Sequence, residues 1–168
     1  MKKDSVVAIV EALNLNEIRY LIVGGLAVVA HGYVRFTADV DLLLSMEPEN
    51  LKKTMLALQG LGYRPRAPVP FVDFADSGKR REWAQEKNMV VFSLFSDNHP
   101  ETEIDLFLES PIDFDPAYLQ AMRQEIVPGT IAVFCSLDDL IQLKKHAGRI
   151  EDEMDIKKLE ELRRADHE

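Results

Sequence analysis

Apolar residues along this chain recur at two different spacings, one typical of helices and one of strands. Residues 4–13 carry apolar side chains three and four positions apart, which predicts an amphipathic helix. Two short apolar runs of strand length follow, at 20–23 and at 38–45. Two more runs, 89–95 and 102–108, are joined by a turn-rich segment, so the sequence predicts a hairpin there.

Glycine and proline mark the ends of other predicted elements. The segment 26–32 is predicted to be a helix that ends at Gly32, and the segment 48–59 a helix that begins at a proline. Three prolines within residues 65–70 predict a loop or an edge strand, because proline cannot donate a hydrogen bond to a β-ladder. An aspartate–proline pair at 115–116 has the form of a helix start, with the aspartate as N-cap.

Two helices are predicted at the end of the chain. Ser136, with an acidic residue three positions later, has the form of a capping box and opens an amphipathic helix that Gly148 ends. A last helix is predicted from about residue 151 to residue 164. Strands and helices mixed at short spacing predict one sheet covered mainly by helices. We therefore expect a single domain over residues 1–168, with residues 136–165 as a helical pair packed on it.

Two aspartates interrupt the second apolar run. Asp39 and Asp41 are two positions apart on a predicted buried strand, so both point to the same face, about 6.5–7 Å apart along the backbone. Asp105 has similar apolar neighbours in a later run, and Glu103 shares its face. If the strands are neighbours, the carboxylates converge and repel, and Mg²⁺ or Mn²⁺ would cancel that repulsion. The alternative is that each carboxylate caps a strand edge or pairs with an arginine such as Arg35.

A glycine pair precedes these aspartates. Gly24 and Gly25 follow a predicted strand and lead into a predicted helix, which leaves backbone N–H groups free to bind a phosphate. A simple tight turn is the alternative. The thirteen residues 26–38 are enough for a helix and a turn that return the next strand beside the first. Three convergent carboxylates beside a phosphate site fit two-metal phosphoryl transfer.

Charge and composition narrow the function classes. A net charge of −9 disfavours a broad nucleic-acid surface, which needs many Lys and Arg contacts to phosphates. A modest basic cluster at residues 64–81 is interleaved with acids, and is either a solvated surface or an acceptor-binding site. The single cysteine, Cys135, excludes an internal disulfide and a cysteine-based zinc site. No apolar run has the length of a membrane span and the start lacks the form of a secretory signal, so we expect a cytoplasmic protein.

These motifs together resemble a known family. The segment IVGGLAVVAHGYVRFTADVDLLL (residues 22–44) looks like the signature of nucleotidyltransferases of the DNA polymerase beta superfamily, with a glycine turn, an Asp–hydrophobic–Asp strand and a later strand bearing a third aspartate. Within that superfamily, Arg35, Thr37 and the tail LIQLKKHAGRIEDEMDIKKL (residues 140–159) are similar to the AbiE-like toxins of abortive-infection systems. The resemblance covers about residues 18–162. It implies an α+β nucleotidyltransferase fold with a mixed sheet, in which the C-terminal helices complete the cleft.

The resemblance also implies roles for individual residues. Gly24 and Gly25 would hold the triphosphate of an NTP, Asp39 and Asp41 would bind both metal ions, and Asp105 would bind the ion that activates the acceptor hydroxyl. Many relatives have a serine after the first glycine, whereas this chain offers only backbone donors there. The further nucleotide-binding candidates are Arg35, Thr37, Lys144, Arg149 and Asp152. For the last three, the alternative is that they form ordinary surface ion pairs on two helices.

The expected activity is therefore a Mg²⁺- or Mn²⁺-dependent transfer of a nucleoside monophosphate from an NTP to an acceptor hydroxyl, with release of pyrophosphate. The acceptor is an RNA end, a protein hydroxyl or a small molecule, and an antitoxin-like protein is a possible partner. The alternative is a catalytically inactive relative that binds a nucleotide or a partner protein. No membrane association is expected.

Overall fold

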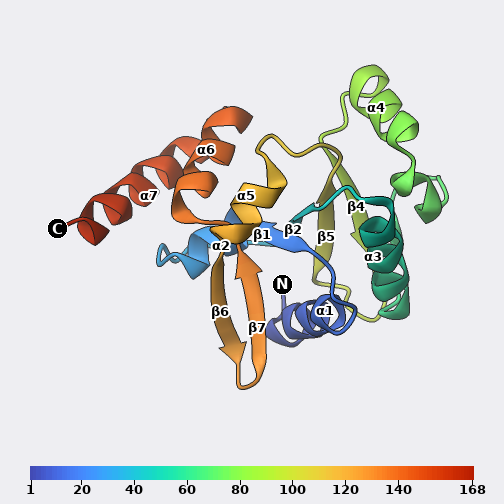
Figure 1. The fold of residues 1–168 in the computed structure, drawn as a ribbon, viewed down its shortest axis with the longest axis horizontal. Coiled ribbons are helices and arrows are strands. Elements are labelled where there is room, and N and C mark those ends of the chain that lie inside the picture. The colour runs from blue at the N-terminus through green and yellow to red at the C-terminus, as the bar shows by residue number, and fades with distance from the viewer.

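The computed structural model describes residues 1–168 and contains one seven-stranded sheet (Figure 1). The strands are β1 (Tyr20–Val23), β2 (Asp39–Leu44), β3 (Arg64–Pro65), β4 (Val91–Phe95), β5 (Glu103–Phe107), β6 (Met122–Val127) and β7 (Thr130–Phe134). The helices are α1 (Lys3–Leu15), α2 (Gly24–Ala30), α3 (Pro48–Gly60), the 3-10 helix η1 (Phe71–Ala75), α4 (Ser77–Glu86), α5 (Phe114–Leu119), α6 (Leu137–Ala147) and α7 (Asp152–Asp166). No helix combines the length and the apolar character that crossing a membrane requires.

The sheet is mixed, which confirms the predicted fold class. Its strand order is β3-β4-β5-β2-β1-β7-β6, with β1 antiparallel to β2 and parallel to β7, and with β2 parallel to β5. The short β3 forms one edge, so the proline-rich segment does contain an edge strand. Because β2 pairs with both β1 and β5, residues from three distant parts of the sequence lie side by side at the centre of the sheet.

The two faces of the sheet differ in burial. Along β4 and β5, fully buried residues alternate with partly exposed ones. Ile104 and Leu106 belong to a continuous hydrophobic core that also includes α1 and α3 residues such as Ile9 and Leu51. Asp105, between them in sequence, points to the other, more open face. The alternation thus places a carboxylate on the open face without removing any apolar side chain from the core.

The C-terminal helices lie together, at the left of Figure 1, on the opposite side of the view from α3 and α4. Helix α6 begins as predicted, because the Ser136 side chain accepts a hydrogen bond from the Asp139 N–H at 3.1 Å. Gly148 follows it with a left-handed φ of 64°. Helix α6 contacts both α7 and α2, so the helical pair packs beside the turn that follows β1.

Several elements differ from the sequence prediction. Helix α2 begins at Gly24, two residues earlier than predicted, so both glycines belong to its first turn. The N-cap of α5 is Asp113, whereas Asp115 lies inside the helix and pairs with Arg19 at 2.7 Å. The sequence analysis did not predict α4 or β6. Neither element has a clear apolar stripe, since α4 buries only two side chains and three of the six β6 residues are exposed.

Candidate active site

The three candidate aspartates lie on neighbouring strands. Asp41 stands opposite Asp105 in the parallel β2–β5 pair, and Asp39 stands opposite Glu103. On the other side of β2, Asp41 is opposite Val23, the last residue of β1. All three aspartates are partly buried and line one cleft of about 320 Å³, which we call the polar cleft. We refer to Asp39, Asp41 and Asp105 as the carboxylate cluster.

Burial and mutual repulsion act on the carboxylate cluster. Burial, together with the charges of Asp105 and Asp39, raises the pKa of Asp41 to about 7. Burial, Asp105 and Glu103 also raise the pKa of Asp39 above its ordinary value. Asp105 is the one that has a close hydrogen bond, which it accepts from the Ser93 hydroxyl at 2.6 Å. As they stand, these carboxylates therefore disfavour one another's charged form.

The donor chemistry of the cluster fits a hard divalent cation such as Mg²⁺ or Mn²⁺. Such ions prefer carboxylate oxygens, and a positive ion would replace the repulsion between the aspartates by attraction. In the geometry observed, no three His, Cys, Asp or Glu side chains form a closed ligand cluster. The fit therefore rests on the type of donor and on the shared cleft.

The glycine pair approaches the aspartates closely. Gly24 has a φ of +66°, and a Cβ atom there would lie 2.0 Å from Oδ2 of Asp41. A Cβ atom on Gly25 would lie 2.6 Å from Oγ1 of Thr37. Both positions thus exclude a side chain for steric reasons, and Gly24 also needs the left-handed conformation that glycine adopts easily. Both glycines line the polar cleft.

Charged residues of the C-terminal helices form a buried group next to the cleft. The Lys144 ammonium lies 2.9 Å from Oδ1 of Asp152 and 2.9 Å from Oδ2 of Asp155, and none of the three side chains is more than 5% exposed. Arg149 donates from Nε to Oδ2 of Asp152 at 2.8 Å. Arg35, from the loop before β2, pairs with Asp155. We call these five residues the ion network.

Charges in the ion network satisfy one another. Burial alone would raise the pKa of Asp152, but hydrogen bonds from Arg149 and Lys144 outweigh it and hold the pKa below its ordinary value. The hydrogen bond to Asp152 raises the pKa of Arg149. Asp152 therefore holds the Lys144 and Arg149 side chains in place beside the cleft.

Asp155 is the member of this network that the sequence analysis did not select. It lies three residues after Asp152, so the two share one face of α7. That spacing indicates that Asp152 and Asp155 can share a partner. It does not identify the partner, because Lys144 and Arg35 come from other segments of the chain. Arg35 is 120 residues away in sequence.

The polar cleft brings all the sequence-predicted site residues together. Phe36, Ala38 and Glu151 also line it, and Phe36 is 82% exposed. The predicted residues that line the cleft are Gly24, Gly25, Arg35, Thr37, Asp39, Asp41, Asp105, Lys144, Arg149 and Asp152.

The basic cluster of residues 64–81 separates into local contacts. Arg64 pairs with Asp97 at 2.9 Å, and Lys79 pairs with Asp73 at 3.0 Å. Arg66 pairs with Glu103, and Arg80 is buried on α4. Four of the five basic side chains are thus engaged within the protein, which favours the interpretation as an ordinary surface.

Comparisons with known proteins identify the fold. No family model matches the chain, and no curated protein sequence matches it significantly. Among solved structures, it is similar to the lincosamide antibiotic adenylyltransferase LnuA, solved with lincomycin bound, with a TM-score of 0.61 and 14% identity over 96% of this chain and 98% of that one. It is also similar to ANT(2")-Ia, solved in complex with adenylyl-2"-tobramycin, with a TM-score of 0.52 and 16% identity over 96% and 94% of the two chains. The chain therefore has the nucleotidyltransferase fold.

Proposed function

We propose that this protein is a nucleotidyltransferase that moves a nucleoside monophosphate from an NTP to an acceptor hydroxyl, with Mg²⁺ or Mn²⁺ as cofactor. The observation that carries the proposal is the convergence of three aspartates, two glycines and three cationic side chains on one cleft. The nucleotidyltransferase fold supports it. The absence of a membrane-spanning helix is compatible with a cytoplasmic location, where NTPs are available.

The proposed roles follow from charge and position. Gly24 and Gly25 leave room for the triphosphate beside Asp41, while Lys144 and Arg149 face the same cleft and would offset its negative charge. Asp39, Asp41 and Asp105 would hold the divalent cation, which when bound supplies charge neutralisation and a lowered pKa for the acceptor hydroxyl. Asp105 would take the hydroxyl proton. Arg35 and Thr37, on the loop before β2, would complete the nucleotide site.

We propose a small hydroxylated molecule as the acceptor, in preference to an RNA end or a protein hydroxyl. The two similar structures described above are solved with an antibiotic or an adenylylated antibiotic. The net charge of −9 and the internal pairing of residues 64–81 also disfavour a large polyanionic partner. A toxin-like role with an antitoxin-like partner protein is supported only by the resemblance of residues 140–159 to AbiE-like proteins.

A second candidate is a catalytically inactive relative that binds a nucleotide or a partner protein. It is favoured by Gly25 and Leu26, neither of which offers a hydroxyl to a phosphate. A thermal-shift assay with NTPs separates the two functions. Stabilisation that requires Mg²⁺ or Mn²⁺ supports the enzyme, whereas no metal-dependent stabilisation supports the binding module.

Label transfer tests the proposed activity directly. The wild type is incubated with each α-labelled NTP, Mg²⁺ or Mn²⁺ and a panel of hydroxylated acceptors. We expect Asp41→Asn to reduce transfer at least about a thousandfold, because it removes a charge that the transition state requires. Asp166→Asn, at the exposed end of α7, is the matched control and should retain wild-type activity. Equal transfer by wild type and Asp41→Asn would contradict the proposal.

A further inference from the structure

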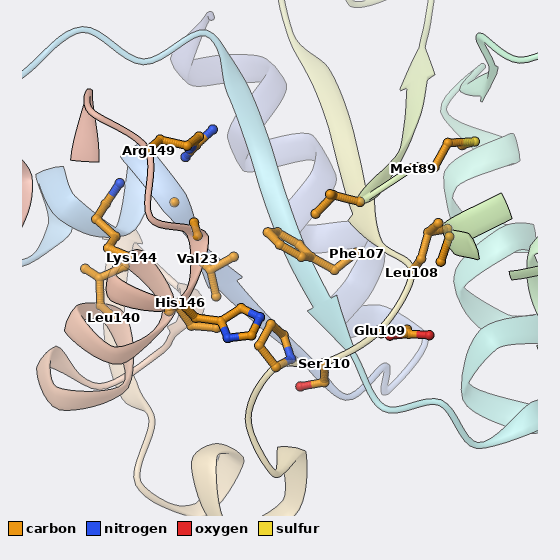
Figure 2. A pocket seen from close by; sticks show the side chains of 16 residues that line it. Val23, Met89, Phe107, Leu108, Glu109, Ser110, Leu140, Lys144, His146 and Arg149 are labelled. Atoms are coloured by element: carbon orange, nitrogen blue, oxygen red, sulfur yellow. The ribbon is translucent and has the colours of Figure 1, made fainter. Parts of the chain in front are cut away.

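A second cavity opens beside the polar cleft (Figure 2). It has a volume of about 370 Å³ and shares Gly24, Lys144 and Arg149 with the cleft. Its remaining lining comes from the end of β1, from α4, from the segment around β4 and β5, and from α6. We call it the apolar pocket. A cavity of this volume is within the range of small-molecule sites.

The lining of the apolar pocket is mostly hydrophobic, with nine of its sixteen residues apolar. In Figure 2, Met89, Phe107 and Leu108 lie on one side of it, while Leu140 and Lys144 of α6 lie on the other. Beyond the two cations shared with the cleft, its other polar side chains are Glu109, Ser110 and His146. The pocket thus offers a broad apolar surface with a single carboxylate.

The pocket and the carboxylate cluster lie on the same face of β5. Asp105 lines the cleft and Phe107 lines the pocket, and two residues along a strand are about 6.5–7 Å apart on one face. A hydroxylated molecule that packs against Phe107 can therefore place a hydroxyl group next to Asp105, its neighbour on the same face of β5. Asp105 is the carboxylate to which we assign the acceptor proton.

We propose that the apolar pocket binds the acceptor, and that the acceptor is a small hydroxylated amphiphile that carries an amine. This inference rests on the proposed nucleotidyltransferase function and names the substrate class of the same site. The apolar part of the molecule packs against Phe107, Leu108 and Leu143, the amine lies near Glu109, and a hydroxyl points to Asp105.

The nucleotide fits the polar cleft better than the pocket. The cleft has Arg35 and Thr37, which the pocket lacks, and the exposed ring of Phe36 offers a surface on which a base can stack. A polyamine without an apolar surface does not suit the pocket, because it leaves the hydrophobic lining uncovered and finds only one carboxylate in that lining.

The transfer step balances with these positions. The acceptor oxygen attacks the α-phosphorus of the NTP and forms a new P–O bond, while the bond between the α-phosphorus and the bridging oxygen breaks. Pyrophosphate leaves with the bonding electron pair, and the hydroxyl proton passes to Asp105. The products are the nucleotidylated acceptor and pyrophosphate.

Binding of three probes tests the proposed acceptor class. Lincomycin is a hydroxylated molecule with one amine and an apolar side chain, octyl glucoside has hydroxyls and an alkyl chain but no amine, and tobramycin is a hydroxylated polyamine. We expect lincomycin to stabilise the full-length protein most in a thermal-shift titration, octyl glucoside less and tobramycin least. Failure of lincomycin to stabilise the protein, or a stronger effect of tobramycin, overturns the proposal.

Filling the pocket tests its location. Ala84 lines the pocket from α4, a helix that contributes nothing to the polar cleft, so Ala84→Phe should weaken lincomycin binding at least tenfold. Ala147→Phe fills the same space from α6 and serves if the first variant unfolds. Ala165→Phe, on an exposed position of α7, is the matched control and should bind lincomycin like the wild type. Unchanged binding in both pocket variants overturns the proposal.

The charge of Glu109 provides a separate readout. Glu109→Gln should weaken lincomycin binding several-fold and leave octyl glucoside binding unchanged, because only lincomycin has an amine. The matched control is Glu125→Gln, an exposed carboxylate of β6. Equal loss for both probes, or loss for neither, overturns the placement of the amine.

NTP binding distinguishes the two proposals. Metal-dependent stabilisation by a mixture of the four NTPs tests the proposed function, and we expect Ala84→Phe to preserve it. If it is absent in the wild type, the proposed function fails. If it is present in the wild type but is lost in Ala84→Phe while lincomycin binding persists, the pocket holds the base, and only the acceptor assignment fails.

Discussion

Two groups of charged residues lie at the same cleft, and they solve the problem of burial in opposite ways. The ion network alternates positive and negative side chains, so each buried charge has a partner within the protein. The carboxylate cluster places three like charges together, and burial, together with the charges of Asp105 and Asp39, raises the pKa of Asp41 to about 7. The charges of the ion network are balanced without a ligand, whereas those of the carboxylate cluster would be balanced only by a bound cation.

This difference separates aspartates that hold cationic side chains in position from aspartates that are free to bind a ligand. Asp152 pairs with Lys144 and Arg149, and Asp155 pairs with Lys144 and Arg35, so both aspartates would act on a substrate only indirectly. Asp39 and Asp41 have no cationic partner at hydrogen-bond distance, so their charge is available to a ligand. Removal of Asp152 or Asp155 should therefore reduce stability, and removal of a cluster residue should reduce activity.

The largest stability effect is expected from Asp155→Asn. It leaves the buried Lys144 and the more exposed Arg35 with one counter-ion fewer, and loss of a buried ion-pair partner typically lowers the free energy of unfolding by about 3–5 kcal/mol. Urea denaturation measures this change. Asp138→Asn on α6, which breaks an exposed pair with Arg163 of α7, is the control and should alter stability by no more than about 0.5 kcal/mol. Similar effects of the two variants would show that the network is not a structural unit.

A comparison of Gly24 with a distant glycine, Gly129, isolates the effect of crowding at Asp41. Gly24 and Gly129 both have positive φ, at 66° and 84°, so alanine at either site costs about 1–2 kcal/mol in backbone strain. Only at Gly24 would the new Cβ meet Asp41, because nothing lies within 4 Å of such an atom at Gly129. We expect Gly24→Ala alone to abolish metal-dependent NTP binding in the thermal-shift assay. Retained binding would show that Asp41 moves aside freely.

A smaller effect of opposite sign is expected from Asp41→Asn in the absence of metal. The substitution removes one of three repelling charges, so in EDTA it should raise the free energy of unfolding by about 1 kcal/mol, or the melting temperature by about 2–4 °C. With Mg²⁺ and NTP present, the wild type should become the more stable protein. A lower melting temperature for Asp41→Asn in EDTA would contradict the difference between the two groups.

The smallest expected effect concerns pH. Because the pKa of Asp152 is held below its ordinary value, its stabilising contribution is present above the unfolded-state pKa of about 4 and is lost as the pH falls through the folded-state pKa. The stability difference between wild type and Asp152→Asn should therefore shrink between pH 6 and pH 3. Urea denaturation at several pH values measures it, and a difference that grows on acidification would contradict the assignment.

Local patterns in the sequence predict the carboxylate cluster but not its surroundings. Asp39, Asp41 and Asp105 each interrupt an apolar strand, and the strand period alone fixes the face to which they point. The position of Gly24 and Gly25 directly after a strand predicts them as phosphate-site candidates. The resemblance to nucleotidyltransferases supplies Lys144 and the other cationic candidates, which local pattern alone leaves as surface residues.

Features that depend on distant segments are not readable from the chain. Asp155 meets Arg35 across 120 residues, and no local spacing indicates that contact. The apolar pocket takes its lining from segments between Val23 and Arg149, each with an ordinary apolar pattern. Helix α4 and strand β6 were missed because their exposed residues hide the periodicity that would predict them. In each case the information lies in tertiary packing.

Helix α7 follows the last strand of the sheet, and it carries both acidic partners of the buried Lys144. A premature stop codon after α6 would leave every strand intact and an ammonium group stranded in the interior. We therefore expect such truncated chains to be degraded rather than to persist as folded protein, so the fifteen-residue α7 is as necessary as the aspartates of the cleft.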